Sequence, residues 1–425
     1  MKKTATKILL IFGIFMFLHE YSFSQFTLSG ELRPRFEYRN GFKRLPDTLS
    51  EFAAFVSQRS RICFDYKTDK IKTKISFQDV GVWGSEKFKT DSATVGLYEA
   101  WAEIPLCDSL SLKVGKQEIS YDNERLFGIC NWNQLGNTHN AAMLKYHKNG
   151  LQIDFTGAFN QAAENLFGTG YPTYPGNYKT LNILWVSKQF TEQFKASLLG
   201  VADGYQRVNS DNTLYMRGTY GGILNYIKEG KYSAAVRGFY QDGRLQTGKQ
   251  VSAYYFSADL TCNLSSKFIL WAGLQYSSGN DGTNLNNTKS DAFNTLYGTQ
   301  HKFGGNMEYF SSISTATKGA GLVDPYLNFI YNLNEKAYFR LDLHYLALQN
   351  NYVVNVTPID KTLGGEADLS FNYNFTKEFS LMAGFSGNIG TKSMEVIVGG
   401  NSIYPGGWGF VMLTFKPVFF KSEKK

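Results

Sequence analysis

Histidines and acidic residues are the first candidates for catalytic chemistry, and here they form no recognisable site. The sequence shows neither metal-ligand spacing nor a nucleophile motif beside His139, His147, His301 and His344. Asp342 and His344 are two residues apart, a spacing that suits an acid–base pair and equally an ordinary structural hydrogen bond. We therefore predict no catalytic residue and no enzymatic activity.

The cysteines do not indicate a metal centre either. No metal-ligand spacing joins Cys63, Cys107, Cys130 and Cys262, and although an oxidising compartment would permit one disulfide, the spacing does not require it. Segment 277–293, SSGNDGTNLNNTKSDAF, is rich in Asn, Asp and Gly, so a calcium-binding loop stays open as an alternative. It lacks the EF-hand spacing. We predict no metal and no cofactor.

Arginines and lysines, in contrast, recur at every second residue of several segments. In Phe26–Arg39, FTLSGELRPRFEYR, apolar residues alternate with charged ones that include Arg33 and Arg35. Successive side chains of a strand point to opposite faces, so the segment has one apolar and one charged face. Its 14 residues exceed an ordinary strand and suffice for a tilted strand that crosses a bilayer. The charged face must then line a water-filled interior, because lipid offers charges no partner.

The elements that position these side chains begin after an N-terminal targeting signal. Lys2, Lys3 and Lys7 precede the apolar run Ile8–Leu18, and small residues follow at Ser22–Ser24. The apolar run is too short to span a membrane, so residues 1–24 are predicted to be a cleaved secretory signal. No later run reaches helix-spanning length, so a membrane protein of this sequence must be a barrel.

Composition supports one barrel domain, residues 25–420, followed by a polar tail, residues 421–425. Aromatic residues make up 16% of the chain, and 41 Gly stand against 9 Pro, which suits aromatic belts and many turns. Without the signal the chain carries 41 basic and 35 acidic side chains, a net charge of +6. This excess indicates an anionic cargo, and surface lysines near lipopolysaccharide explain it equally well.

The strand pattern predicts an all-β, transmembrane, antiparallel up-and-down β-barrel of about 18 strands. The predicted strands are Phe26–Arg39, Val56–Tyr66, Ile71–Phe77, Tyr98–Ile104, Leu110–Val114, Ala142–Tyr146, Leu151–Asn160, Thr180–Phe190, Phe194–Ala202, Tyr215–Lys228, Lys231–Arg244, Val251–Asn263, Phe268–Ser277, Leu322–Tyr331, Ala337–Leu348, Leu363–Phe375, Phe379–Ile389 and Gly407–Phe420. We expect the last to pair with the first, because an unpaired edge in lipid leaves backbone groups without partners.

The connections alternate between very short turns and long loops. Thr68–Asp69 and Cys107–Ser109 are short, as periplasmic turns of outer-membrane barrels are. Ser120–Asn140, Gly279–Gly321 and Asn350–Thr362 are too long to be turns. We expect them to be extracellular or folded into the pore, and long ordered loops usually carry function.

Two blocks of the sequence resemble the outer-membrane alginate export porin family. They are Gly115–Tyr146, GKQEISYDNERLFGICNWNQLGNTHNAAMLKY, and Ser278–Phe310. The resemblance extends over most of the mature chain and implies an 18-stranded barrel whose electropositive constriction passes a polyanionic polysaccharide. The family pattern maps onto Lys116, Gln117, Glu124 and Arg125. The sequence departs from it where the family tends to carry further arginines, at Gly136–Asn137, His139–Asn140 and Met143.

The predicted function is therefore an outer-membrane channel of a Gram-negative bacterium that passes an anionic oligo- or polysaccharide, alginate-like polyuronate included, by facilitated diffusion. The candidate substrate-binding residues are Arg33, Arg35, Arg59, Arg61, Lys72, Lys74, Lys113, Lys116, Arg125, Lys145, Arg217, Arg237 and Arg340. The first six should form one basic patch on three neighbouring strands. Interior carboxylates, Glu366 and Asp368 among them, offer the alternative that these cations only neutralise the wall.

Two other functions remain open from the sequence. One is a general small-solute porin, and the other is an outer-membrane hydrolase that would use Asp342 and His344. The predicted partners are outer-membrane lipid, an anionic carbohydrate and a periplasmic export or uptake component, with no nucleic acid.

Overall fold

The computed structural model describes residues 24–86, 94–168, 176–207 and 213–422. The predicted signal sequence, residues 1–24, lies outside this part of the chain except for Ser24. Among the described residues no helix is long and apolar enough to cross a membrane. All four cysteines are free thiols.

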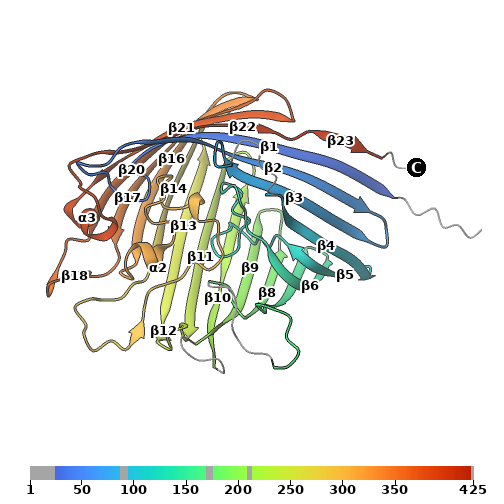
Figure 1. The fold of residues 1–425 in the computed structure, drawn as a ribbon, viewed down its shortest axis with the longest axis horizontal. Coiled ribbons are helices and arrows are strands. Elements are labelled where there is room, and N and C mark those ends of the chain that lie inside the picture. Colours follow the sequence, from blue (N-terminus) through green and yellow to red (C-terminus); the bar gives the residue numbers. More distant parts are fainter. Residues whose placement is uncertain (1–23, 87–93, 169–175, 208–212, 423–425) are drawn as a thin grey trace, which may run out of the picture.

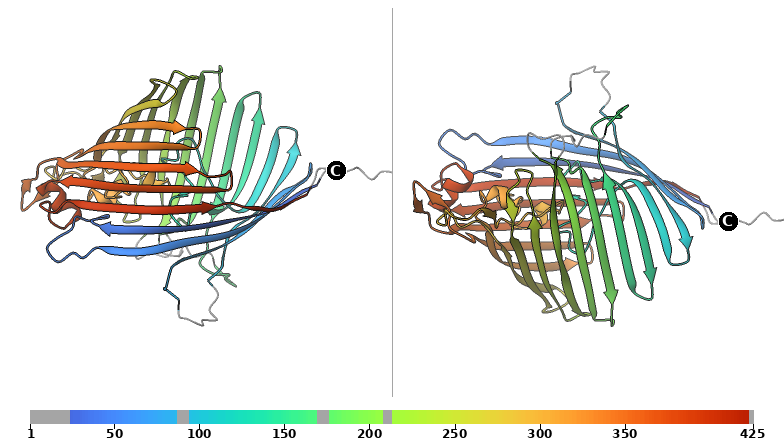
Figure 2. Two further views of the ribbon diagram at one scale, coloured as in Figure 1. Left: turned by 90° about the horizontal axis from the view of Figure 1, so that it is seen from above. Right: turned by 90° about the horizontal axis from the view of Figure 1, so that it is seen from below.

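Eighteen antiparallel strands form one closed barrel (Figure 2), and each predicted strand overlaps one of them. They are β1 (Gln25–Asn40), β2 (Ala53–Lys67), β3 (Lys72–Val82), β4 (Gly96–Cys107), β5 (Leu110–Gln117), β6 (His139–Lys148), β7 (Leu151–Phe159), β8 (Thr180–Gln189), β9 (Phe194–Gln206), β10 (Leu214–Lys228), β11 (Tyr232–Gly243), β13 (Ala253–Asn263), β14 (Phe268–Ser277), β16 (Leu322–Asn334), β17 (Ala337–Leu348), β20 (Thr362–Asn374), β21 (Phe379–Gly390) and β22 (Gly406–Phe415).

The barrel closes between its first and last strands, as the sequence predicts. β1 pairs with β2 along one edge and with β22 along the other, where Arg35 lies opposite Met412. A short strand, β23 (Val418–Lys421), continues β22 after an interruption at Pro417 and also pairs with β1. The backbone N–H of Gly30 donates to the carbonyl oxygen of Pro417 at 3.0 Å. Within the described residues, no long edge of the sheet is therefore left unpaired.

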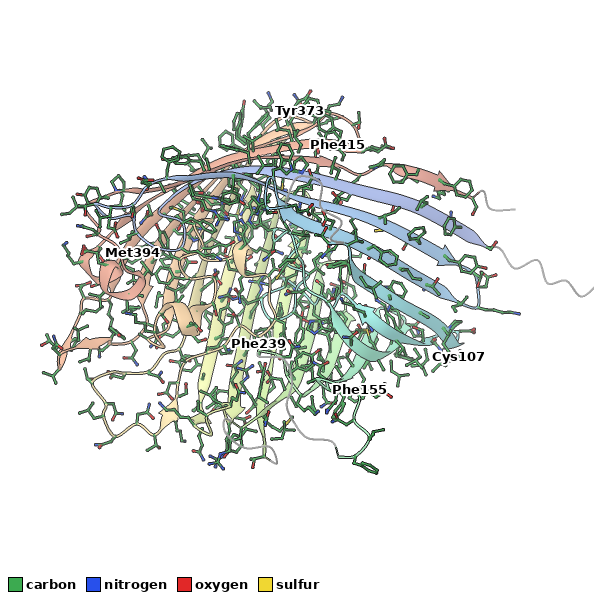
Figure 3. The ribbon with its side chains drawn as sticks, in the orientation of Figure 1. Cys107, Phe155, Phe239, Tyr373, Met394 and Phe415 are labelled. Atoms are coloured by element: carbon green, nitrogen blue, oxygen red, sulfur yellow. The ribbon has the colours of Figure 1, made fainter. Side chains whose placement is uncertain are left out.

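The alternation in β1 separates lipid from lumen. Leu32 and Phe36 point outward and are 41% and 44% exposed, whereas Arg33 and Arg35 point inward and are buried. Aromatic rings gather on the outer surface near the short turns, where the ring centroids of Phe379 and Phe415 lie 4.5 Å apart. Figure 3 labels Phe415 in this group. An apolar outer surface with an aromatic belt is the lipid-facing surface of a transmembrane barrel.

The long connections lie at the end of the barrel opposite the C-terminal end, where Figure 1 shows α3 (Lys392–Val398) and β18 (Val353–Val354). The third predicted long loop contains the hairpin of β18 with β19 (Thr357–Pro358). The other two fold into the lumen, and we call them loop A (residues 118–138) and loop B (residues 278–321). Loop B contains β15 (Lys289–Ser290), η1 (Gln300–Lys302) and α2 (Ile313–Ala316), and its β15 pairs with β12 (Gln250–Val251).

Two apolar clusters join the in-folded loops to the barrel wall. The first joins loops A and B to the inner face of β8 and β9, where Ile183, Trp185 and Val201 are buried. The second joins loop B and α3 to β16–β22 and includes Phe310 and Trp408. The inner faces of β8 and β9 are therefore largely apolar, unlike the charged face of Phe26–Arg39. Their inner side chains pack against loop A rather than facing water.

Candidate functional site

Loop A is held by arginines of the first two strands. The guanidinium of Arg33 donates to the carbonyl oxygens of Asn131 (2.7 Å) and Asn133 (3.2 Å). Its Nε donates to Oε1 of Gln134 at 3.0 Å, and the amide of Gln134 in turn donates to Oγ of Ser57 at 3.1 Å. One planar, five-donor side chain thus satisfies several acceptors of an irregular loop.

Arg35 and Arg59 act in the same way. Arg35 donates to the carbonyl oxygen of Trp132 at 2.8 Å and to Glu37 at 2.9 Å. Arg59 forms an ion pair with Glu31 and donates to Oδ1 of Asn131 at 2.9 Å. We call Arg33, Arg35 and Arg59 the charged wall.

The other three cations of the predicted basic patch lie beside the charged wall and have separate partners. Lys72 pairs with Glu103 (3.3 Å) and Lys74 with Glu99 (2.6 Å). Arg61 donates to Oε1 of Gln78 at 2.8 Å and lies 3.6 Å from the ring centroid of Tyr98. The structure brings all six together on neighbouring strands, but most of their charge is already engaged.

Lys113 of β5 and Lys145 of β6 continue this wall, whereas Lys116 has the outward phase of Val114, so its predicted place in the lumen is wrong. Lys145 pairs with Glu103 at 3.2 Å, whereas Lys113 lies 4.0 Å from the ring centroid of Trp101. Lys116 donates to the carbonyl oxygen of Leu97 at 2.5 Å. Lys113 and Lys116 thus have no carboxylate partner within the described part of the chain.

The three predicted arginines of β10, β11 and β17 are each neutralised by an aspartate. They form the ion pairs Arg217–Asp203 (2.5 Å), Arg237–Asp259 and Arg340–Asp342 (2.8 Å).

Arg125, in loop A, differs from the wall arginines. It is 3% exposed and has no ion pair with any described residue. Its guanidinium lies between two rings, 4.6 Å from the centroid of Phe303 and 5.2 Å from that of Tyr255, and its Nε has no hydrogen-bond partner. Burial lowers the pKa of Arg125 below its ordinary value. A buried cation without a carboxylate is unusual and marks a place where an anion would be favourable.

Loop B is held by carboxylates rather than by arginines. The backbone N–H of Met307 donates to Oε1 of Glu366 at 2.7 Å, and that of Asn306 donates to Oδ2 of Asp368 at 3.1 Å. Gly305 has a φ of +89°, and a Cβ there would lie 2.4 Å from Glu366. Only glycine brings this backbone so close to the wall. The sequence placed both carboxylates in the interior without indicating this role.

An ionic cluster links loop B to the β1–β2 connection and to loop A. Oε1 of Glu308 lies 2.9 Å from Nδ1 of His301, and Oε2 lies 2.8 Å from Nζ of Lys43. Burial raises the pKa of Glu308, but His301 and Lys43 outweigh it and lower the pKa to about 2. The ring of His301 stacks on Trp132 of loop A, with centroids 4.3 Å apart and planes 6° apart.

Between the two loops and strands β11–β22 lies a cavity of about 570 Å³. His344, which lines it, bonds to Asp324 at 2.9 Å, and Asp342 bonds to Arg340, so the pair proposed for a hydrolase is not joined. Among the described residues no three His, Cys, Asp or Glu side chains group as metal ligands. In the loop considered for calcium, an oxygen of Asp281 already accepts from nearby loop groups.

The comparisons with known proteins fit this geometry. No protein-family model and no curated protein sequence matches the chain. Among solved structures, OccAB1 of Acinetobacter baumannii is similar with a TM-score of 0.63 at 10% identity, over 93% of this chain and 97% of that one. OccK9 (OpdG) of Pseudomonas aeruginosa has a TM-score of 0.61 at 12% identity, over 93% and 98%.

A third similar structure is the outer membrane protein OpdK of Pseudomonas aeruginosa, with a TM-score of 0.60 at 10% identity, over 93% of this chain and 99% of that one. These likenesses do not show alginate export. Together with the closed barrel and its lipid-facing surface, they show that the chain has the fold of an outer-membrane porin of Gram-negative bacteria.

Proposed function

We propose that the chain is an outer-membrane diffusion channel for short anionic oligosaccharides, oligo-uronates among them, and that loops A and B narrow its lumen. The observation that carries the proposal is a set of lumenal cations without a carboxylate partner among the described residues. Arg61 and Lys113 lie on aromatic rings of β4, and Arg125 lies between two rings behind the cavity.

This arrangement suits passage rather than tight capture. An aromatic face holds a cation weakly and leaves its charge available, whereas a carboxylate partner neutralises it. Conduction requires contacts favourable enough for a solute to enter and weak enough for it to leave. The cavity between the loops has the volume of a small-molecule site, which favours short oligomers over a polymer. The similar structures include OpdK with vanillate, an organic anion.

Reversal potentials in planar bilayers under a KCl gradient test the proposal. We expect the wild-type channel to prefer anions and a trimer of galacturonate to block its current. The double variant Arg61→Gln with Lys113→Gln should lose most of this preference. Lys188→Gln is the matched control, because Lys188 has the opposite strand phase to the inward-facing Ser187 and bonds to the carbonyl oxygen of Asn149.

Two results would overturn the anionic cargo. One is a wild-type channel that prefers cations, and the other is a double variant whose reversal potential equals that of the wild type. Either result, with conduction intact, would support a general small-solute porin.

A further inference from the structure

Aromatic rings enclose the cavity between the loops and the wall from both sides. Tyr255, Trp271 and Tyr326 contribute from β13, β14 and β16, and Trp132 and Phe303 contribute from loops A and B. Trp271 and Tyr326 pack edge to face, with centroids 5.9 Å apart. The cavity therefore offers apolar faces at its two sides, at a volume typical of small-molecule sites.

Six charged side chains that line this cavity form three ion pairs. The pairs are Arg237–Asp259, Arg340–Asp342 (2.8 Å) and Lys302–Glu124 (3.5 Å). Asp368 also lines the cavity and has no ion pair with any described residue, so attraction of an anion does not explain what the cavity would select.

Several buried polar atoms on the strands around this cavity lack a hydrogen-bond partner in the described part of the chain. Trp271 Nε1, Asn328 Oδ1, Ser257 Oγ and Asp368 Oδ1 have no hydrogen-bond partner among the described residues. Trp271 lies opposite Asn328 in the strand register, and Asp342 lies between Asn328 and Asp368. One donor, two acceptors and one hydroxyl are thus arranged along neighbouring strands. Unpaired buried polar groups are costly, so such a cluster calls for a polar ligand or a rearrangement.

We propose that this cavity is a subsite for a pyranose ring, which is recognised by its shape and hydroxyl groups rather than by its charge. A pyranose has apolar C–H faces that suit the aromatic rings and a rim of hydroxyls that can both donate and accept. Once the side chains that cover these buried atoms move, Trp271 Nε1 would donate to a sugar hydroxyl, and Asn328 and Asp368 would accept from others. A purely aromatic ligand would leave these atoms unpaired. The proposal rests on the channel function above and names what the channel recognises in a solute.

The test compares a cyclic sugar with an open-chain polyol that carries similar hydroxyl groups. Glucose and sorbitol are added in turn to the full chain in planar bilayers, and the ion current is recorded. Glucose should reduce the current in a saturable way, whereas sorbitol, which has hydroxyls but no ring face, should not. Asn328→Ala and Trp271→Ala should each raise the half-saturating glucose concentration roughly five- to tenfold.

Two further variants keep the test decisive. Trp271→Phe retains a ring face and should retain most of the block. Phe329→Ala changes the outward-facing neighbour of Asn328 and should leave the block unchanged. Equal block by glucose and sorbitol, or no block by either in a conducting channel, would overturn the sugar subsite. A chain that inserts and conducts no ions would instead overturn the channel function itself.

Discussion

Two inner walls hold loop A, one by hydrogen bonds and the other by apolar packing. The charged wall donates hydrogen bonds from Arg33 and its neighbours to loop carbonyls. The apolar wall, which we define as the inner-facing Ile183, Trp185 and Val201 of β8 and β9, packs against aromatic residues of the same loop. Tyr121 stacks on Trp185 with centroids 4.9 Å apart.

The two walls therefore differ in whether they stabilise loop A inside the barrel or fix its position there. Burial of apolar surface is non-directional and contributes most of the free energy of a packed segment. Hydrogen bonds contribute less net free energy but fix geometry, because a misplaced acceptor is left unpaired. We infer that the apolar wall keeps loop A inside the barrel, whereas the charged wall determines where its residues 131–134 lie.

The largest expected effect comes from the apolar wall. Ile183 is fully buried, and Ile183→Ala should lower the free energy of unfolding by about 2–5 kcal/mol, because it leaves a cavity under loop A. Urea unfolding in lipid vesicles measures this change. The control is Leu184→Ala on the same strand, whose side chain faces lipid and is 47% exposed, so its cost should be clearly smaller. Equal costs at the two positions would mean that the wall does not pack the loop.

Loop B, in contrast to loop A, is held in part by the ion pair of Glu308 with Lys43. The folded-state pKa of Glu308 is about 2, below the ordinary value of 4.5. A lowered folded pKa gives stability that is present above the unfolded pKa and is lost as the pH falls through the folded pKa. The contribution, about 3 kcal/mol at neutral pH, should therefore decline between pH 4.5 and 2.

Glu308→Gln should remove this dependence. Its unfolding free energy should be lower than that of the wild type at pH 7, and the two should converge near pH 2. Unfolding curves across this range measure the effect. Parallel curves for wild type and variant would show that the cluster with His301 and Lys43 does not stabilise the loop.

Much of the fold could be predicted from the sequence, because the period of two along each strand is a local property. All eighteen strands follow from it, and the closure of β1 on β22 follows from the cost of an unpaired edge in lipid. The partners of the inward cations could not be predicted. Alternation tells which face Arg33 is on, but not that a loop about 100 residues later brings its carbonyl groups there.

The sequence of β8 itself contains a signal for the apolar wall. In Leu181–Val186, LNILWV, apolar residues occupy both phases of the strand rather than one. A strand that is apolar on both faces is buried on both faces. In a membrane barrel one face meets lipid, so the other must meet protein. The run therefore indicates where an in-folded loop packs.

The smallest of the three effects is expected at the charged wall. Arg33→Gln removes the donors that serve Asn131 and Asn133, and unpaired buried acceptors cost about 1–3 kcal/mol. Because the apolar wall remains, loop A should stay in the lumen with residues 131–134 loosened. The open-channel current should then fluctuate more, while unfolding changes only modestly. Arg33→Lys should behave similarly, since an ammonium cannot reproduce the planar fork. Arg44→Gln is the control, because Arg44 pairs with Asp47 at 2.9 Å in the β1–β2 connection, away from loop A. If the current of Arg33→Gln is as quiet as that of the control, the apolar wall alone both retains and positions the loop.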